Sequence, residues 1–129
     1  MEEIKLTDNV AIYQAVTDYY EGWYTPDAKL MEACLHSDLA KRAIKLDEAG
    51  KEYLLHLTNE IMMDATRKGG GSNRLTEKKN WTITILDRYE EIATVKVASV
   101  EYMEYIHLAR QNGHWQIVNV LYTDCRANL

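Results

Sequence analysis

The sequence has no phenylalanine, one proline and two cysteines in 129 residues. Cys34 and Cys125 lie far apart and fit neither a metal-binding nor a redox spacing, so we expect both to be free thiols. Histidines never occur in an HxH or HExxH pattern. The sequence therefore predicts no metal site, and nothing in it predicts a cofactor.

Long apolar runs and long basic runs are also missing. No stretch approaches the ~18–20 apolar residues of a membrane-spanning helix, so no membrane span is expected. The net charge is −5, whereas nucleic-acid binding usually needs a basic face, so no nucleic-acid partner is expected. The segment MEEIKLTDN is acidic and has no apolar h-region. It does not resemble a secretory signal, and the cytoplasm is the expected compartment.

Tyrosine and tryptophan take the place of the missing phenylalanine, with nine and three copies. Both side chains combine an apolar body with a polar tip, so they suit a core that borders a pocket or an interface. The hydrophobic fraction of 47% and the charged fraction of 27% are ordinary for a globular protein. The length fits a single domain over residues 1–129, large enough to bury a core.

The first half of the chain is predicted to be mostly helical. Thr7 or Asp8 can cap a first helix, because their side-chain oxygens accept hydrogen bonds from free backbone N–H groups. Apolar residues then recur at helical spacing on one face, namely Ile12, Ala15, Val16, Tyr19 and Trp23. Pro26 ends this helix, and a second helix follows as far as His36.

Three further segments complete the first half. Residues 43–46 favour a brief edge strand, and the apolar spacing from Lys51 to Arg67 predicts a third helix. The glycine run at residues 69–71 is not followed by the lysine and hydroxyl residue of a phosphate-binding loop. We therefore expect the glycines to form a mobile connection between the last helix and the first long strand.

The second half predicts strands. Trp81, Ile83 and Ile85 alternate with threonines, which is typical of a half-buried strand, and a polar turn is expected near residues 87–90. The alternation resumes from residue 93. One strand over residues 91–110 would be roughly 66 Å long at ~3.3 Å per residue, against an expected radius of gyration of about 14 Å. The chain must therefore reverse near Ser99–Glu101.

Asn112-Gly113 is the strongest turn signal, because a two-residue type I′ hairpin needs positive φ at both central positions. The pairs expected from this turn are Gln111 with His114, Leu108 with Ile117, Ile106 with Asn119, and Glu104 with Leu121. One face of the hairpin then carries Tyr102, Glu104, Ile106, Leu108, Trp115, Ile117, Asn119 and Leu121. Because the other face is also apolar, we expect a homodimer through this outer sheet face.

Helices followed by consecutive antiparallel strands predict an α+β fold. Three N-terminal helices packed on one face of a curved antiparallel sheet would leave a cone-shaped cavity between the two layers. A small molecule could bind in that cavity, and the aromatic residues suit its walls.

Several motifs resemble a known family. They are Tyr19-x-x-Gly22, Leu35-His36-Ser37-Asp38, Ala93-x-Val95-x-Val97, Glu104-Tyr105-Ile106-His107-Leu108 and the block from Asn112 to Asn119. Together they resemble the nuclear transport factor 2-like superfamily, with its cystatin-like cone, and within it the lumazine-binding branch beside the polyketide-cyclase-like proteins. The resemblance implies a pocket between sheet and helices and frequent homodimerisation. It implies no single activity, because this cone hosts isomerases, cyclases, dehydratases and non-catalytic binders.

Three residues are candidates for acid–base chemistry. The position of Glu104 is similar to that of the acidic oxyanion-hole residue of ketosteroid isomerases, and a carboxylate in an apolar cavity suits proton transfer. Tyr19 is similarly placed to their hydrogen-bonding tyrosine, and His36 to a histidine at the pocket mouth. Each has a structural alternative: a carboxylate bonded to Tyr or Arg, a core tyrosine and a structural histidine. The isomerases also carry a carboxylate base where this chain has Arg42 and Ala43.

The ligand pocket is expected to be lined by Tyr20, Trp23, Trp81, Tyr102, Ile106, Trp115, Ile117 and Asn119. The predicted function is that of a pocket protein that binds a small, largely apolar ligand. The alternatives are an acid–base enzyme for a cyclic or carbonyl compound and an interaction module whose cavity is filled by its own side chains.

Overall fold

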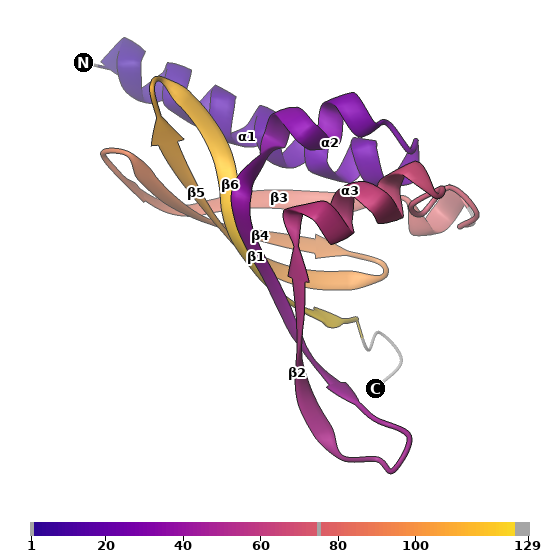
Figure 1. Cartoon of the computed structure of the whole chain (residues 1–129). Helices are drawn as coiled ribbons and strands as arrows, with labels where there is room; N and C mark the ends of the chain where they lie inside the picture. Colours follow the sequence, from indigo (N-terminus) through magenta and orange to yellow (C-terminus); the bar gives the residue numbers. More distant parts are fainter. Residues whose placement is uncertain (1, 75, 126–129) are drawn as a thin grey trace.

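The computed structural model describes residues 2–74 and 76–125, and the side chains of 2–6 and 78 lie outside that description. Three helices cover one face of a six-stranded curved sheet (Figure 1). The predicted α+β architecture is therefore confirmed. None of the described helices is both long enough and apolar enough to cross a bilayer.

The first two helices meet at the single proline. Helix α1 spans Glu2–Tyr24 and α2 spans Ala28–Cys34, so Pro26 falls in the turn as predicted. The Asp27 side chain caps α2 by accepting hydrogen bonds from the backbone N–H groups of Lys29 and Leu30. The expected cap at Thr7 or Asp8 is wrong, because α1 begins several residues earlier.

The region after α2 differs most from the sequence prediction. Strand β1 spans Leu35–Leu46, β2 spans Glu52–Thr58 and α3 spans only Asn59–Arg67. The predicted long third helix is thus half strand, and the predicted brief edge strand is a twelve-residue inner strand with β2 outside it. The reason is the turn at Asp47, whose carboxylate accepts from the N–H groups of Ala49 and Lys51 and so folds β2 back onto β1.

Strands β3 (Trp81–Tyr89), β4 (Ile92–Ser99), β5 (Tyr102–Gln111) and β6 (His114–Asp124) form a meander. The reversal near Ser99–Glu101 is confirmed, whereas the turn expected at 87–90 lies later, at Glu90–Glu91. The strand order is β2-β1-β6-β5-β4-β3. Neighbours are antiparallel except β1 and β6, which are parallel. The sheet is therefore mixed at that one pair, because β6 reaches β1 only after a long excursion of the chain.

The last hairpin has the predicted turn but only part of the predicted register. Asn112 and Gly113 both have positive φ, and Gln111 pairs with His114 and Leu108 with Ile117. A bulge in β6 at Val118 then shifts the register by one residue. The observed pairs are Ile106 with Val120 and Glu104 with Tyr122, not Asn119 and Leu121. Since side chains alternate between faces, this bulge turns Val120 and Tyr122 inward and Asn119 and Leu121 outward.

Asp8 fixes the first helix to the far end of the sheet. Its carboxylate accepts a hydrogen bond of 3.0 Å from Trp115 Nε1 and one of 2.9 Å from Arg110, and Arg88 lies 3.6 Å away. Asp8 is buried despite its charge. The Trp115 indole, helped by the two guanidinium groups, holds the pKa of Asp8 below its usual value although burial opposes this.

We predict that Asp8→Asn destabilises the protein by about 1–3 kcal/mol at pH 7, because Arg110 and Trp115 lose a charged acceptor. Because the folded-state pKa of Asp8 is lowered, its contribution is complete above the unfolded-state pKa of about 3.9 and fades as the pH falls through the folded value. Urea unfolding at pH 7 and below pH 4 measures both effects. Glu21→Gln, an exposed change on the same helix, is the control. An equal loss at both pH values would contradict the prediction.

Candidate functional site

A cavity of about 150 Å³ lies between the helices and the sheet. Apolar and aromatic side chains dominate its wall, and its charged groups are Lys41 and Glu104. The other lining residues are Tyr19, Tyr20, Trp23, Leu57, Ile61, Met62, Ala65, Tyr102 and Tyr122. Together with Lys41 and Glu104, these residues come from α1, α3 and four strands, so the site exists only in the assembled fold.

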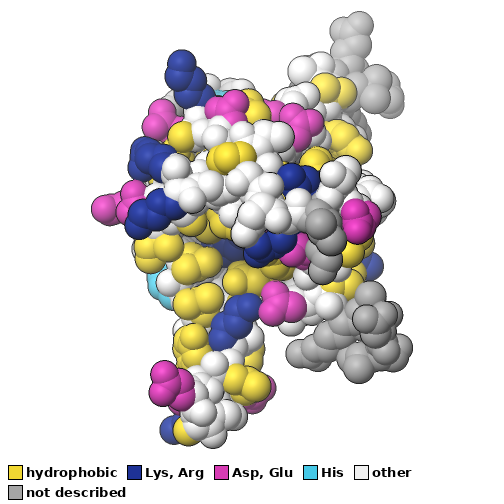
Figure 2. All heavy atoms as spheres, turned by 90° about the vertical axis from the view of Figure 1, so that its right-hand side faces the viewer, with side chains coloured by type: hydrophobic (Ala, Val, Ile, Leu, Met, Phe, Trp, Pro, Cys, Tyr) yellow, Lys and Arg dark blue, Asp and Glu magenta, His cyan; other side chains and the backbone are white. Residues whose placement is uncertain are grey.

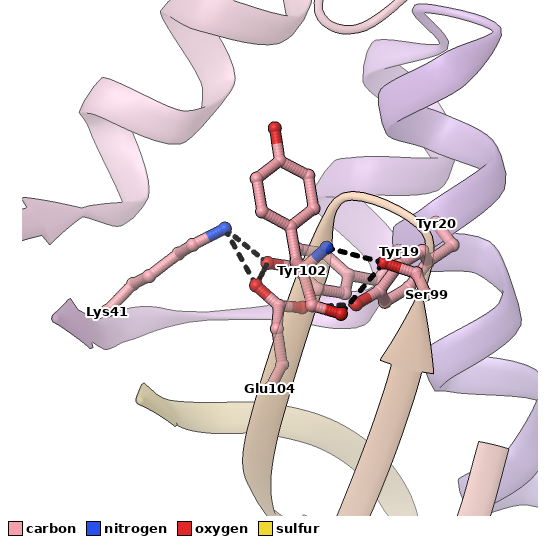
Figure 3. Close-up of polar contacts among 6 residues, drawn as sticks. All are labelled: Tyr19, Tyr20, Lys41, Ser99, Tyr102 and Glu104. Atoms are coloured by element: carbon pink, nitrogen blue, oxygen red, sulfur yellow. Dashed lines mark hydrogen bonds and ion pairs between the residues drawn. The ribbon is translucent and has the colours of Figure 1, made fainter. Parts of the chain in front are cut away.

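Glu104 is the centre of the polar part of this cavity. Its side chain is 2% exposed. Tyr20 Oη donates a hydrogen bond of 2.6 Å to one carboxylate oxygen, and Tyr19 Oη donates one of 3.3 Å to the other (Figure 3). Lys41 Nζ lies 3.4 Å from the second oxygen. A carboxylate removed from water needs such partners, and Glu104 receives them from α1 and β1.

Lys41 is the charged site residue that the sequence analysis missed. It lies on β1 between Leu39 and Ala43, two buried residues on the same strand face. Lys41 Nζ donates a hydrogen bond to Tyr19 Oη and lies 4.8 Å from the centre of the Tyr122 ring. The alternation of Leu39, Lys41 and Ala43 on one strand face would predict Lys41 as a site residue. The sequence analysis predicts a strand only from residue 43, so it does not place Lys41 on that face.

The two phenols at Glu104 are held in their protonated form. Burial first, and then the neighbouring Glu104 carboxylate, raises the pKa of Tyr19 and of Tyr20 well above the usual value for tyrosine. Both hydroxyl groups therefore stay protonated well above neutral pH and donate hydrogen bonds to Glu104. Tyr19 Oη also accepts a hydrogen bond from Lys41.

The aromatic wall continues behind this polar group. Trp81 stacks on Tyr24 with the ring centres 5.9 Å apart and contacts Tyr20 at 5.3 Å. The glycine run is packed rather than loosely connected: Gly71 N donates to the backbone oxygen of Trp23, and a Cβ on Gly71 would meet the Trp23 ring at 2.7 Å. Only glycine allows this approach, so the expected mobile connection is instead a support for the cavity wall.

Of the eight predicted ligand-contacting residues, the structure places three in the wall: Tyr20, Trp23 and Tyr102. The other five lie outside the wall for three physical reasons. Trp81 stacks behind the wall, and the apolar side chains buried in the closely packed core do not border the cavity: Ile106, Trp115 and Ile117. Asn119 lies on the opposite, exposed face because of the bulge at Val118.

His36 does not join Glu104 and Tyr19. Its Nδ1 accepts from the backbone N–H of Asp38, so Nε2 carries the proton and donates to Gln111 Oε1 at 2.9 Å. This places His36 against the tip of the β5–β6 hairpin, outside the cavity wall. The prediction of a histidine at the pocket mouth is therefore wrong, because β1 begins at residue 35 and carries His36 away. Where the isomerases carry a carboxylate base, this chain has an exposed Arg42 and a buried Ala43, and neither side chain has a carboxylate.

Within residues 2–74 and 76–125, no three His, Cys, Asp or Glu side chains gather closely enough to hold a metal ion. Both cysteines are free thiols. Burial raises the pKa of Cys34 to about 12, which leaves it as an inert core residue at neutral pH. The polar chemistry of the cavity therefore comes from Lys41, Glu104 and the tyrosines.

Residues 7–123 match the model of the family described as "Putative lumazine-binding". The chain belongs to this family. No functionally curated protein shows significant similarity to the sequence. The fold of this family member is that of the nuclear transport factor 2-like superfamily, as its resemblance had implied.

Solved structures share the fold at low sequence identity. An NTF-2 like protein of unknown function from Silicibacter pomeroyi has 14% identity and a TM-score of 0.75, covering 94% of this chain and 98% of that one. A cystatin-like protein of unknown function from Nostoc punctiforme has 12% identity and a TM-score of 0.63, covering 94% and 93%. A ketosteroid isomerase-like protein from Erwinia carotovora atroseptica has 13% identity and a TM-score of 0.57, covering 89% and 94%.

We predict that Tyr20→Phe lowers the free energy of unfolding by about 1–3 kcal/mol at pH 8, because Glu104 loses its shortest hydrogen bond. The raised pKa of Tyr20 has a second consequence. Its contribution is complete below the unfolded-state pKa of about 10 and is lost as the pH rises further, since only the unfolded state then releases the proton.

Chemical unfolding between pH 8 and 11 measures this slope. Above pH 10, the free energy of unfolding should fall more steeply with pH in the wild type than in Tyr20→Phe. The two slopes should differ by about 1.4 kcal/mol per pH unit, because the variant lacks one titrating group. Tyr13→Phe, which removes an exposed hydroxyl from the same helix, is the control. Equal slopes for wild type and Tyr20→Phe would show that Tyr20 is not held protonated by its surroundings.

Proposed function

We propose that this protein binds a small, largely apolar molecule in the cavity between its helices and its sheet. The observation that carries the proposal is an aromatic cavity with one buried, fully paired polar group, Glu104, in its wall. Ligand sites are typically concave and apolar with a few fixed polar groups. The matched family model, whose description is "Putative lumazine-binding", supports a ligand-binding function.

The size of the cavity limits the ligand. About 150 Å³ is the volume of an engineered apolar cavity that takes up benzene, which makes a single ring the natural occupant. A larger molecule would have to extend past the rim, where Tyr102 and Tyr122 meet edge to face with ring centres 5.9 Å apart. We therefore propose a one-ring ligand, or a larger ligand that inserts one ring.

A second candidate is an acid–base enzyme that acts on a cyclic or carbonyl compound. The hydrogen bond between Tyr19 and Glu104 beside the cavity favours it. Deuterium exchange separates the two candidates: an enzyme that removes a proton next to a carbonyl exchanges the α-hydrogens of bound cyclohexanone in D₂O faster than buffer does. A binding protein leaves the exchange at the buffer rate. Binding is the preferred proposal, because both oxygens of Glu104 already accept hydrogen bonds from protein groups.

We also propose a homodimer through the outer sheet face. Exposed apolar side chains form a row on the outer face of four neighbouring strands as two cross-strand pairs, Leu54 with Ile44 and Leu121 with Tyr105. The exposed Arg42 on β1 lies opposite Leu121, between the two pairs. The row begins on the arm, the end of the β1–β2 hairpin formed by residues 43–55, which projects from the body (Figure 1). Figure 2 shows hydrophobic side chains along this arm. An isolated two-stranded hairpin is only marginally stable in water, so a partner that covers the row would stabilise it.

The cytoplasm remains our proposed compartment for this dimer. The two cysteines of each chain, Cys34 and Cys125, are free thiols, and reduced thiols are typical of that compartment.

Blocking the cavity tests the binding proposal. Ala65→Phe adds a ring at the cavity wall, and we expect it to weaken the binding of cyclohexanone by about tenfold or more, since filled volume excludes the ligand. Titration followed by ¹H–¹⁵N NMR gives the affinity and the residues affected. Ala49→Phe, in the exposed turn of the arm, is the matched control. Equal affinities, or shifts confined to residues outside the cavity, would refute the proposed site.

Charging the apolar row tests the dimer. Leu121→Glu should raise the dissociation constant of the dimer by about thirtyfold or more, because a carboxylate would lose its water in an apolar interface. Sedimentation velocity at micromolar concentrations measures the change. Val10→Glu places the same charge on an exposed position of α1, away from the sheet, and should leave the dimer intact. A wild-type protein that sediments as a monomer would refute the dimer.

A further inference from the structure

The polar groups of the cavity are not equally available to a ligand. Tyr20 Oη donates a hydrogen bond to one oxygen of Glu104, and Tyr19 Oη donates one to the other, so the O–H donors of both tyrosines are used on Glu104. Tyr19 Oη also accepts a hydrogen bond from Lys41. A ligand in the cavity therefore meets two phenol rings, and not two free phenol donors. The sequence analysis expected Tyr19 to donate its hydrogen bond to a ligand, whereas Tyr19 donates it to Glu104.

Lys41 is the group with a free donor. Its ammonium has three N–H bonds. One is donated to Tyr19 Oη, and Nζ also forms an ion pair with Glu104 at 3.4 Å. The ammonium donates no other hydrogen bond to an oxygen or nitrogen in the described part of the chain, so it keeps a free N–H. The Lys41 side chain is 12% exposed and that of Glu104 only 2%. The ammonium is thus the charged group that a ligand can reach first.

The other hydroxyl groups lie at the rim. The Tyr102 hydroxyl points away from Glu104 (Figure 3) and lies near Arg74, while that of Tyr122 lies near Lys45. Lys41 itself lies between the Tyr19 and Tyr122 rings, 5.1 and 4.8 Å from their centres, which hold its charge in place. These contacts fix the direction from which a polar ligand atom can approach.

The charges of the cavity also balance. Lys41 and Glu104 are its only charged lining residues among those described, and they form one ion pair. An anionic ligand that reaches Lys41 would stand beside the Glu104 carboxylate, and a cationic ligand would stand beside the Lys41 ammonium. Either would bring like charges together in a poorly solvated site, where that repulsion is strong.

We infer that Lys41 recognises the polar atom of the ligand, and that the cavity selects an uncharged ring with an acceptor oxygen over an ionised ring of similar size. The inference rests on the proposed ligand-binding function and adds the ligand class to it. The acceptor oxygen receives a free N–H of Lys41, while the ring packs against the aromatic and aliphatic wall. Glu104 keeps Lys41 oriented, and its negative charge offsets the attraction of the Lys41 ammonium for an anionic ligand.

Matched ring compounds test this inference. Cyclohexanone and methylenecyclohexane have nearly the same shape, but only the ketone has an acceptor. Cyclohexanecarboxylate and cyclohexylammonium supply the two charges. NMR titration of each compound gives its affinity and shows whether cavity residues shift. In the wild type we expect the ketone to bind and both ions to bind about tenfold more weakly or not at all.

Two variants assign the effect to Lys41. In Glu104→Gln the Lys41 donor remains but its charge is unbalanced, so binding of cyclohexanecarboxylate should rise by about tenfold or more. In the double variant Lys41→Met/Glu104→Gln the ketone should lose about tenfold relative to methylenecyclohexane, because the donor is gone. The double change leaves no unpaired buried charge, so it is better tolerated than Lys41→Met alone.

The outcomes separate the two proposals. If none of the four compounds shifts cavity residues in the wild type, the proposed binding function fails. If the rings bind but the preference for the ketone over methylenecyclohexane is the same in wild type and the double variant, only the role of Lys41 is refuted. Wild-type binding of the carboxylate as strong as that of the ketone, or no gain of carboxylate binding in Glu104→Gln, would refute charge balance as the basis of selection.

Discussion

The buried carboxylate of Glu104 constrains the rest of the site. A charged group that is 2% exposed is stable only with close partners, and Glu104 takes them from two other parts of the chain: Tyr19 and Tyr20 on α1 and Lys41 on β1. These contacts fix the rotation of α1 on the sheet and the face of β1 that looks inward. The cavity lies beside this group, and both Lys41 and Glu104 line it.

A second polar anchor acts at the other end of the same helix. Asp8 holds Trp115, Arg110 and Arg88, three residues from three different strands. Helix α1 is thus fixed near both ends by a buried or nearly buried carboxylate, one on the helix and one on the sheet. Apolar packing between these points, through Ile12 and Val16, has no directional preference of its own, so the paired charges set the orientation.

The sequence predicted well wherever a local signal was enough. Pro26 ended α1, Asn112-Gly113 formed the two-residue turn, and the alternation from Trp81 defined β3. It failed where distant pairing decided the outcome. Residues 52–58 have helical apolar spacing, yet they form β2 because β1 offers them a free strand edge. The bulge at Val118 has no marker in the sequence, although it turns Tyr122 inward and Asn119 outward.

Some properties of this protein were therefore determined by sequence alone. The strands of the second half, the position of the last hairpin and the family membership follow from local patterns and motifs, because turn residues and side-chain alternation act over a few positions. The tertiary structure alone decided the composition of the cavity. Lys41 contacts Glu104, and His36 lies away from the cavity, only because β1 pairs in parallel with β6 and has β2 on its other side. A contact between residues so far apart in the chain depends on the packing of the whole sheet, which no short stretch of sequence records.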